Sequence, residues 1–256
     1  MLSIPTMIFS ATAESSEIDV VRDAFSRPGA YVFVARNDED CLHLLAMASR
    51  WAVVSTIPSK GPLHCGFAAG ASDARDLLSG CRRELRALFD GSTATVCGDA
   101  SPEGTVRRVT PLDEDLCGYP GNMYLDEMMA IQEHLQPVCR ARAGAVLEAL
   151  AAGPEYQRVT VLRANLAVGD VVMYEVMVMR PGTTVVLEKD RLATFLSALP
   201  ADDAVTIFAA EGCGEEYVVS FCHGHTSRFF CVPVSGTYKK ASTDDILADL
   251  AEAMNV

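Results

Sequence analysis

The chain is divided near its middle by the stretch Leu112-Asp113-Glu114-Asp115-Leu116-Cys117-Gly118-Tyr119-Pro120-Gly121-Asn122. One proline, two glycines and three acidic residues stand in this stretch, a composition typical of a linker rather than of a helix or strand. Helix and strand patterns lie on both sides of it. We therefore predict two α+β domains joined by a connector, with the order of elements in the first half recurring in the second.

Four amphipathic segments predict helices, because apolar residues recur in them at helical spacing. Ser15 or Ser16 can cap the first helix at its N-terminus. In the second, the apolar stripe consists of Leu77, Leu78, Cys81, Leu85 and Leu88. The predicted helices span residues 15–25, 72–90, 136–150 and 188–199.

Runs rich in β-branched and aromatic residues, separated by short polar breaks, predict antiparallel strands. In the first half they span residues 6–13, 30–35, 41–48, 51–58, 63–67, 93–98 and 104–110. In the second half they span residues 158–164, 171–180, 183–187, 204–209, 217–222 and 228–234.

The composition favours a globular protein, since half of the 256 residues are hydrophobic. A formal net charge of −13 argues, taken alone, against a nucleic-acid partner, because phosphate binding requires an excess of Lys and Arg. The nine cysteines form no CxxC pair, which favours reduced thiols in an intracellular compartment. No signal-peptide pattern or run of about 18 apolar residues is found, so no membrane attachment is predicted.

Three motifs follow one another along the chain. The first is Leu44-Leu45-Ala46-Met47-Ala48-Ser49-Arg50-Trp51-Ala52-Val53-Val54. The second is Leu112-Asp113-Glu114-Asp115 followed by Gly118-Tyr119-Pro120, and the third is Gly224-His225 followed by Arg228-Phe229-Phe230-Cys231-Val232-Pro233. In this order and spacing they resemble the proliferating cell nuclear antigen family of DNA sliding clamps, with its Leu-x-x-Met-Asp motif, its interdomain connector and its closing strand. Ala48 stands where the family has Asp, and Trp51 where it has His.

The resemblance implies the α+β DNA-clamp (processivity-fold) architecture, in which two similar β-α-β-rich domains are joined by a connector and their helices line a hole for DNA. The expected boundaries are 1–111 for the first domain, 112–128 for the connector and 129–236 for the second domain. Residues 237–256 add a C-terminal helical extension. Ser242 or Thr243 can cap this helix, and its apolar stripe would pack on its own subunit or in the partner pocket.

A basic lining inside an acidic shell would reconcile the net charge with binding of double-stranded DNA without sequence preference. The alternative is that these residues are ordinary solvated faces of amphipathic helices. The candidate DNA-binding residues lie on or beside the predicted helices: Arg22, Arg27, Arg75, Arg82, Arg83, Arg86, Arg140, Arg142, Lys189 and Arg191.

The resemblance also implies an apolar pocket beside the connector, where a DNA polymerase or another clamp-binding peptide docks. Plain core packing is the alternative for these residues. The candidate partner-binding residues are Met47, Trp51, Leu116, Tyr119, Met123, Phe230 and Pro233.

No metal, cofactor or catalytic residue is predicted. Cys222-His223-Gly224-His225, with Cys213 or Cys231, could supply zinc ligands, but a tight turn explains the same residues. The catalytic motifs GxSxG, HExxH, GxGxxG and the P-loop are not present in the sequence.

The leading hypothesis is therefore a non-enzymatic processivity factor for DNA replication and repair. We expect it to be a homo-oligomer, a trimer by the resemblance, that encircles DNA in the nucleus or at a viral replication site. Two alternatives remain open: a clamp-like subunit of a transcription or checkpoint complex, and a non-ring processivity factor. An enzyme with an unrecognised site is a third hypothesis.

Overall fold

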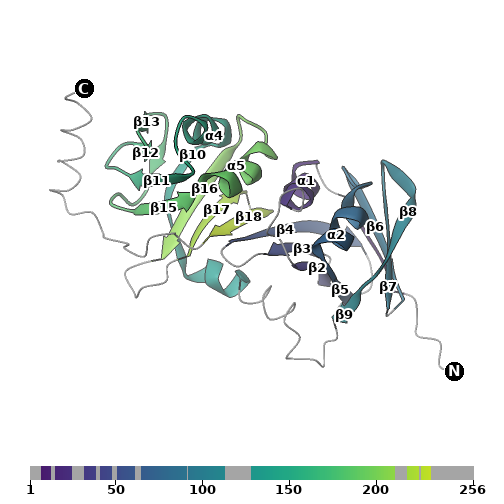
Figure 1. Cartoon of the computed structure of the whole chain (residues 1–256). Coiled ribbons are helices and arrows are strands. Elements are labelled where there is room, and N and C mark those ends of the chain that lie inside the picture. Colours follow the sequence, from purple (N-terminus) through teal and green to yellow (C-terminus); the bar gives the residue numbers. More distant parts are fainter. Residues whose placement is uncertain are drawn as a thin grey trace. The chain divides into compact units, whose positions relative to one another are not determined.

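A computed structural model describes residues 7–12, 15–24, 32–38, 41–47, 51–60, 65–90, 92–112, 128–210, 218–224 and 226–231 (Figure 1). The chain forms two compact units, the first comprising Met1–Ala130 with His225–Ser227 and the second comprising Ile131–Gly224 with Arg228–Val256. The extension predicted at residues 237–256 and most of the connector lie outside the described residues. Among the described residues, no helix has the length and apolar character needed to cross a bilayer.

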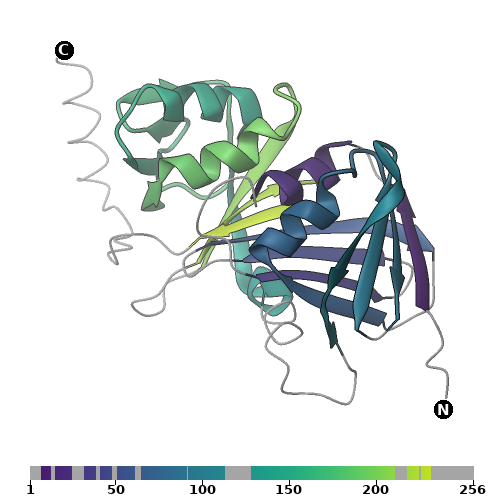
Figure 2. The same ribbon diagram turned by 45° about the vertical axis from the view of Figure 1, so that its right-hand side comes forward.

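The described part of the first unit consists mainly of antiparallel strands that pair in the order β9-β5-β2-β3-β4-β1-β6-β7-β8. Helices α1 and α2 lie on one face of these strands (Figure 2). The elements are β1 (Met7–Thr12), α1 (Ser15–Ala24), β2 (Val32–Asp38), β3 (Cys41–Met47), β4 (Trp51–Lys60), β5 (Cys65–Gly70), α2 (Ala71–Leu78), β6 (Glu84–Phe89), β7 (Thr93–Gly98), β8 (Ser101–Arg108) and β9 (Thr110–Leu112).

The second unit contains a sheet in the order β14-β10-β16-β17-β18 and a smaller sheet in the order β13-β12-β11-β15. Helices α4 and α5 pack against each other (Figure 1). Residues 128–134 are helical and precede these elements. The elements are β10 (Leu135–Arg142), α4 (Ala143–Ala151), β11 (Tyr156–Val161), β12 (Leu166–Val168), β13 (Val171–Met173), β14 (Met177–Val178), β15 (Thr184–Glu188), α5 (Lys189–Ser197), β16 (Ala204–Ala210), β17 (Val219–His223) and β18 (Ser227–Cys231).

The two units share one pattern of strand pairing. In the first, the strand before α1 pairs antiparallel with the strand after α2, so that Met7 lies opposite Phe89. In the second, the strand before α4 pairs in the same way with the strand after α5, and Leu135 lies opposite Ala210. The strands inside each helix pair repeat the arrangement, since β2 pairs with β5 and β11 with β15. The predicted α+β repeat is confirmed.

Each unit has an apolar core closed by aromatic side chains. In the first unit, the rings of Phe67 and Phe89 lie 5.9 Å apart between centroids. In the second, Phe229 contacts Phe195 and Phe221, at 5.6 Å and 6.3 Å. All five side chains are buried, so each unit buries its own large aromatic residues.

The predicted helix 72–90 is wrong beyond Leu78. Ser79 ends α2, where its backbone N–H and its hydroxyl both donate to the Asp76 carbonyl. Residues from Glu84 onwards form β6, in which Leu85 is 2% exposed and Leu88 is 37% exposed. A helical stripe would bury both leucines, whereas strand alternation separates them. The Ser79-Gly80 pair was the overlooked signal, because this dipeptide favours a turn.

The predicted helix 136–150 is also wrong in its first half, which forms β10. Pro137 did not exclude a helix, because proline is tolerated in a first helical turn. In the structure Pro137 lies at an irregularity in the β10–β16 register, a common position for proline in sheets. The neighbouring Val138 carbonyl accepts the N–H groups of Met179 at 2.9 Å and Arg180 at 3.0 Å. Helix α4 therefore begins only at Ala143, and the strand predicted at 171–180 is divided into β13 and β14.

Gly98 lies where the β7–β8 region packs closely against the turn between α2 and β6. An added Cβ at Gly98 would overlap the Gly80 carbonyl, whereas an added Cβ at exposed Gly70 meets nothing within 4 Å. We predict that Gly98→Ala lowers the free energy of unfolding by about 1–3 kcal/mol in urea denaturation. The control Gly70→Ala should change it by less than about 0.5 kcal/mol. Equal stability of the two variants would contradict this packing.

Asp90 caps the β6–β7 turn. Its carboxylate accepts the backbone N–H groups of Ser92 at 2.9 Å and Thr93 at 2.7 Å, as well as the Thr93 hydroxyl at 2.6 Å. The Thr93 hydroxyl bond, followed by the backbone bonds, lowers the pKa of Asp90 to about 2 from 3.8. The ionised carboxylate therefore stabilises the fold above pH 4, and this contribution is lost as the pH falls toward 2.

We predict that Asp90→Asn is less stable than the parent protein at pH 5 and that the difference shrinks between pH 4 and pH 2. Urea unfolding at a series of pH values measures this difference. A difference that stays constant over that interval would show that the turn does not depend on the ionised carboxylate.

Candidate nucleic-acid interface and partner surface

The helices carry fewer basic residues than the sequence pattern predicted. Arg86, Arg140 and Arg142 lie on strands, and Arg82 and Arg83 lie in the turn between α2 and β6. Arg27 lies outside the described residues. Helices α1, α2, α4 and α5 together hold four basic residues (Arg22, Arg75, Lys189 and Arg191) and seven acidic ones (Glu17, Asp19, Asp23, Asp73, Asp76, Glu148 and Asp190), a net charge of −3. The placement of Arg86, Arg140 and Arg142 in helices is therefore wrong, while DNA binding by the candidate residues stays a prediction.

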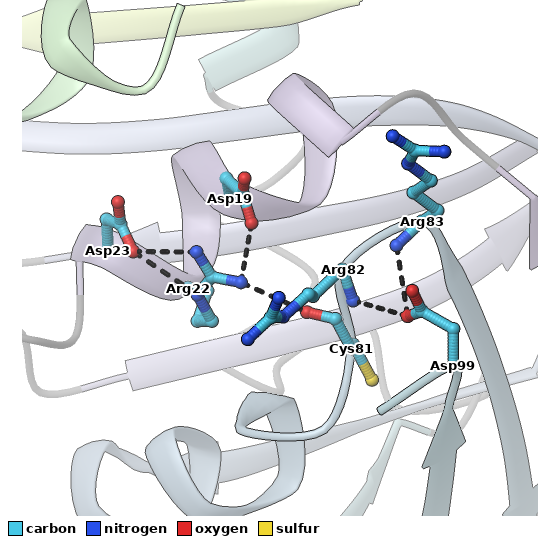
Figure 3. Close-up of polar contacts among 7 residues, drawn as sticks. All are labelled: Asp19, Arg22, Asp23, Cys81, Arg82, Arg83 and Asp99. Carbon is cyan, nitrogen blue, oxygen red and sulfur yellow. Dashed lines mark hydrogen bonds and ion pairs between the residues drawn. The ribbon is translucent and has the colours of Figure 1, made fainter. Parts of the chain in front are cut away.

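The turn between α2 and β6 presents two exposed arginines, Arg82 and Arg83. The Asp99 Oδ1 atom accepts the backbone N–H of Arg82 at 2.8 Å and that of Arg83 at 3.1 Å (Figure 3). These two bonds hold the pKa of the Asp99 carboxyl below its usual value. The backbone of the turn is thus fixed while both guanidinium groups remain at the surface.

Arg22 of α1 lies beside this turn, but its charge is already engaged. Its guanidinium pairs with Asp19 at 2.5 Å and Asp23 at 3.3 Å, and it donates to the Cys81 carbonyl at 3.3 Å (Figure 3). Burial raises the pKa of Asp19, and the nearby Arg22 opposes that rise. Arg22 therefore braces α1 against the turn.

Other basic groups of the first unit also have acidic partners. Arg86 pairs with Glu84 on β6. Arg107 of β8, which no sequence motif singled out, pairs with Asp73 at 3.7 Å and Asp76 at 2.5 Å on α2. In the sequence, only the spacing of Asp73 and Asp76, three positions apart on a helix, indicates that one basic group could pair with both. That β8 supplies this group depends on the tertiary fold.

In the second unit, Arg140 and Arg142 share the exposed face of β10, and Arg142 pairs with Glu175 at 2.6 Å. Lys189 has a structural contact, because its ammonium donates to the Gly153 carbonyl just beyond α4 at 2.8 Å. Arg191 pairs with Glu188 at 3.3 Å.

The described candidates for the partner surface are buried in their own units. Met47 ends β3, Trp51 begins β4, and Phe230 lies within β18. This burial matches core packing, the alternative interpretation of these residues. The remaining candidates, Leu116, Tyr119, Met123 and Pro233, lie outside the described residues.

Cys222 and His223, from the possible zinc motif, have contacts of their own. The Cys222 thiol lies 3.5 Å from the Gln132 side-chain oxygen, and His223 Nε2 lies 2.9 Å from Asp203 Oδ2. No group of three metal-ligating side chains occurs in the described part of the chain, while Cys213 and His225 are not described.

Burial also raises the pKa of several thiols. It raises the pKa of Cys81 to about 12 and that of Cys139 to about 11. Burial raises the pKa of Cys231 as well. A thiol that stays protonated is a poor nucleophile, so these cysteines act as small core residues.

No protein-family model matches the chain, and no curated protein matches it. Solved structures do. The DNA polymerase III beta subunit of Thermotoga maritima superposes with a TM-score of 0.59 at 9% identity, covering 91% of this chain and 66% of that one. PCNA of A. fulgidus, solved with the C-terminal region of FEN-1, superposes with a TM-score of 0.56 at 13% identity. The match covers 91% of this chain and 99% of that one. The Helicobacter pylori beta clamp, bound to a DNA ligase peptide, superposes with a TM-score of 0.61 at 8% identity. The match covers 92% of this chain and 68% of that one.

The chain thus spans nearly the full PCNA chain and about two thirds of each of these two bacterial subunits. At such low identities the likeness concerns the fold.

Lys189 and Arg142 provide a matched test of charge and structure. We predict that Lys189→Gln lowers the free energy of unfolding by about 1 kcal/mol, because the Gly153 carbonyl loses a charged donor. The exposed Arg142–Glu175 pair contributes little, so Arg142→Gln should cost less than about 0.5 kcal/mol. Urea denaturation compares the two variants. The reverse order would show that the Lys189 contact is not structural.

Proposed function

We propose that this chain, which has the fold of DNA sliding clamps, is a processivity factor that encircles duplex DNA and recruits replication and repair proteins. The observation that carries the proposal is the strand pairing repeated in both units, together with the match to clamp structures along nearly the full chain. In this proposal the chain is not an enzyme. It acts by tethering.

A ring requires subunits to join head to tail through two different surfaces. Each unit offers an outer strand, β8 in the first and β14 in the second, at the ends of the strand order. Large apolar side chains are exposed at or near these strands: Val106 is 53% exposed, Met177 61% and Tyr174 74%. Exposed edges and apolar side chains call for a partner. We propose that β8 of one subunit pairs with the β13–β14 region of the next, in a homotrimer.

We propose that the proteins recruited by the ring dock through short peptides. The A. fulgidus and Helicobacter pylori clamps were solved with such segments, from FEN-1 and from a DNA ligase. We propose that Leu116, Tyr119, Met123 and Pro233 contact such peptides in this chain, whereas Met47, Trp51 and Phe230 are buried in their own units.

A second candidate function is favoured by the charge of the helices. Their net charge of −3 gives little attraction to phosphates. A clamp-like subunit of a transcription or checkpoint complex, or a processivity factor that lies on DNA without closing a ring, would need less attraction from these helices.

DNA binding separates the two functions. We predict that Arg82→Ala with Arg83→Ala weakens binding to duplexes of two unrelated sequences equally, because phosphate contacts do not read bases. The slope of log affinity against log salt should fall by about 0.9 for each arginine–phosphate pair that the substitutions remove. Arg163→Ala is the control, since Arg163 is an exposed arginine of the second unit that is not a candidate DNA-binding residue.

Fluorescence anisotropy over a salt series measures these affinities. Sequence-independent binding that requires Arg82 and Arg83 supports a DNA clamp. If the parent protein does not bind duplex DNA at low salt, the clamp-like subunit is favoured. A change of sequence preference in the double variant would contradict backbone contact.

A further inference from the structure

We propose that Asp99 is a positioning residue for DNA contact: it holds the α2–β6 turn in the conformation that presents Arg82 and Arg83 to the phosphate backbone. This inference rests on the proposed function. It adds a residue that makes no DNA contact itself and has the same sign of charge as the phosphates.

The geometry centres on the peptide group between Cys81 and Arg82. Its carbonyl accepts the Arg22 guanidinium at 3.3 Å, and its N–H donates to Asp99 at 2.8 Å (Figure 3). A peptide group is planar, so fixing both its polar ends fixes its orientation. The following N–H, that of Arg83, donates to the same carboxylate oxygen at 3.1 Å. Both arginines therefore leave a backbone that has little freedom to rotate.

The β7–β8 turn that carries Asp99 is itself locked against the α2–β6 turn. The Ala100 N–H donates to the Gly80 carbonyl at 3.0 Å. An added Cβ at Gly80 would overlap Ser101, and one at Gly98 would overlap Gly80. The two turns approach so closely that side chains at Gly80 and Gly98 would not fit between them. This close packing holds the Asp99 carboxylate beside the N–H groups of Arg82 and Arg83.

The side chains of the two arginines emerge from this fixed backbone in different directions. Figure 3 shows the Arg82 guanidinium on the side of Arg22 and the Arg83 guanidinium directed away from that cluster. Two exposed cations at successive positions meet phosphates at a lower entropic cost if the turn that carries them keeps its shape. In a flexible turn, binding would have to overcome the entropy of ordering both side chains and backbone.

Because Asp99 is negatively charged, the positioning role predicts a specific direction for the change in DNA affinity when Asp99 is removed. As an exposed carboxylate near a phosphate backbone, Asp99 opposes binding through simple repulsion, and its removal would strengthen binding. As a positioning residue it favours binding, and its removal would weaken it. The two effects have opposite directions, so one affinity measurement separates them.

The experiment is a double-mutant cycle on the full chain, read as duplex affinity over a salt series. Asp99→Ala is introduced into the parent and into the Arg82→Ala, Arg83→Ala variant. We expect a loss of roughly three- to tenfold in the parent and no further loss in the double variant, because only coupled residues depart from additivity. Asp99→Asn should lie between the parent and Asp99→Ala, since its amide oxygen still accepts a hydrogen bond.

Asp90→Ala is the matched control. Asp90 is also an exposed aspartate that accepts two backbone N–H groups, at the opposite end of β6. We expect its removal to leave DNA affinity unchanged although the turn loses stability. Melting temperatures of all variants, measured under the binding conditions, establish that each is folded.

The outcomes separate this inference from the proposed function. If Arg82→Ala with Arg83→Ala weakens binding but Asp99→Ala strengthens it or leaves it unchanged, the positioning role is overturned and the DNA contact remains. An equal loss in both backgrounds also overturns it, because Asp99 would then act on the fold in general. If the double arginine variant binds as the parent does, the two arginines do not touch DNA and the positioning role is overturned, while duplex binding by the parent still supports the proposed function.

Discussion

The ladder between the strand that precedes the first helix and the strand that follows the second helix organises each unit. In the first unit, six residue pairs join β1 to β6, and the register from Met7–Phe89 to Thr12–Glu84 has no break. Because the chain leaves this ladder into α1 and returns to it after α2, both helices must pack back on the strands between them. The second unit uses the same ladder, β10 with β16, around α4 and α5. A fold that is this similar in two halves can persist although their sequences differ, since backbone hydrogen bonds carry the ladder.

Short-range patterns in the sequence predicted many of the elements, including the ladder strand β16. Helix α1 and helix α5 match the predicted segments closely, because apolar residues at helical spacing define them locally. The ladder strands β6 and β10 were predicted as helices. Leu85 and Leu88 suit a helical stripe as well as a strand, and only the partner strand, far along the chain, decides between the two.

This misassignment had consequences for the candidate site. Five of the ten basic residues expected on or beside helices lie on strands or in the α2–β6 turn. Two others, Arg22 and Arg191, form ion pairs with acidic residues of the same unit. The role of Asp99 could not be predicted, because it depends on two turns that approach each other through glycines. Under the proposed function, attraction to DNA would come from the short α2–β6 turn rather than from the helices. Few exposed cations among many acids would hold DNA loosely, which suits sliding.

The proposed function requires the chain to be one segment of a closed ring. Sedimentation equilibrium at micromolar concentration measures the number of chains in the particle, because the mass obtained does not depend on the shape of the particle. We expect a single species with three times the 27.5 kDa of one chain, unchanged by dilution within this range. A species of 27.5 kDa at all concentrations, with or without duplex DNA, would contradict it.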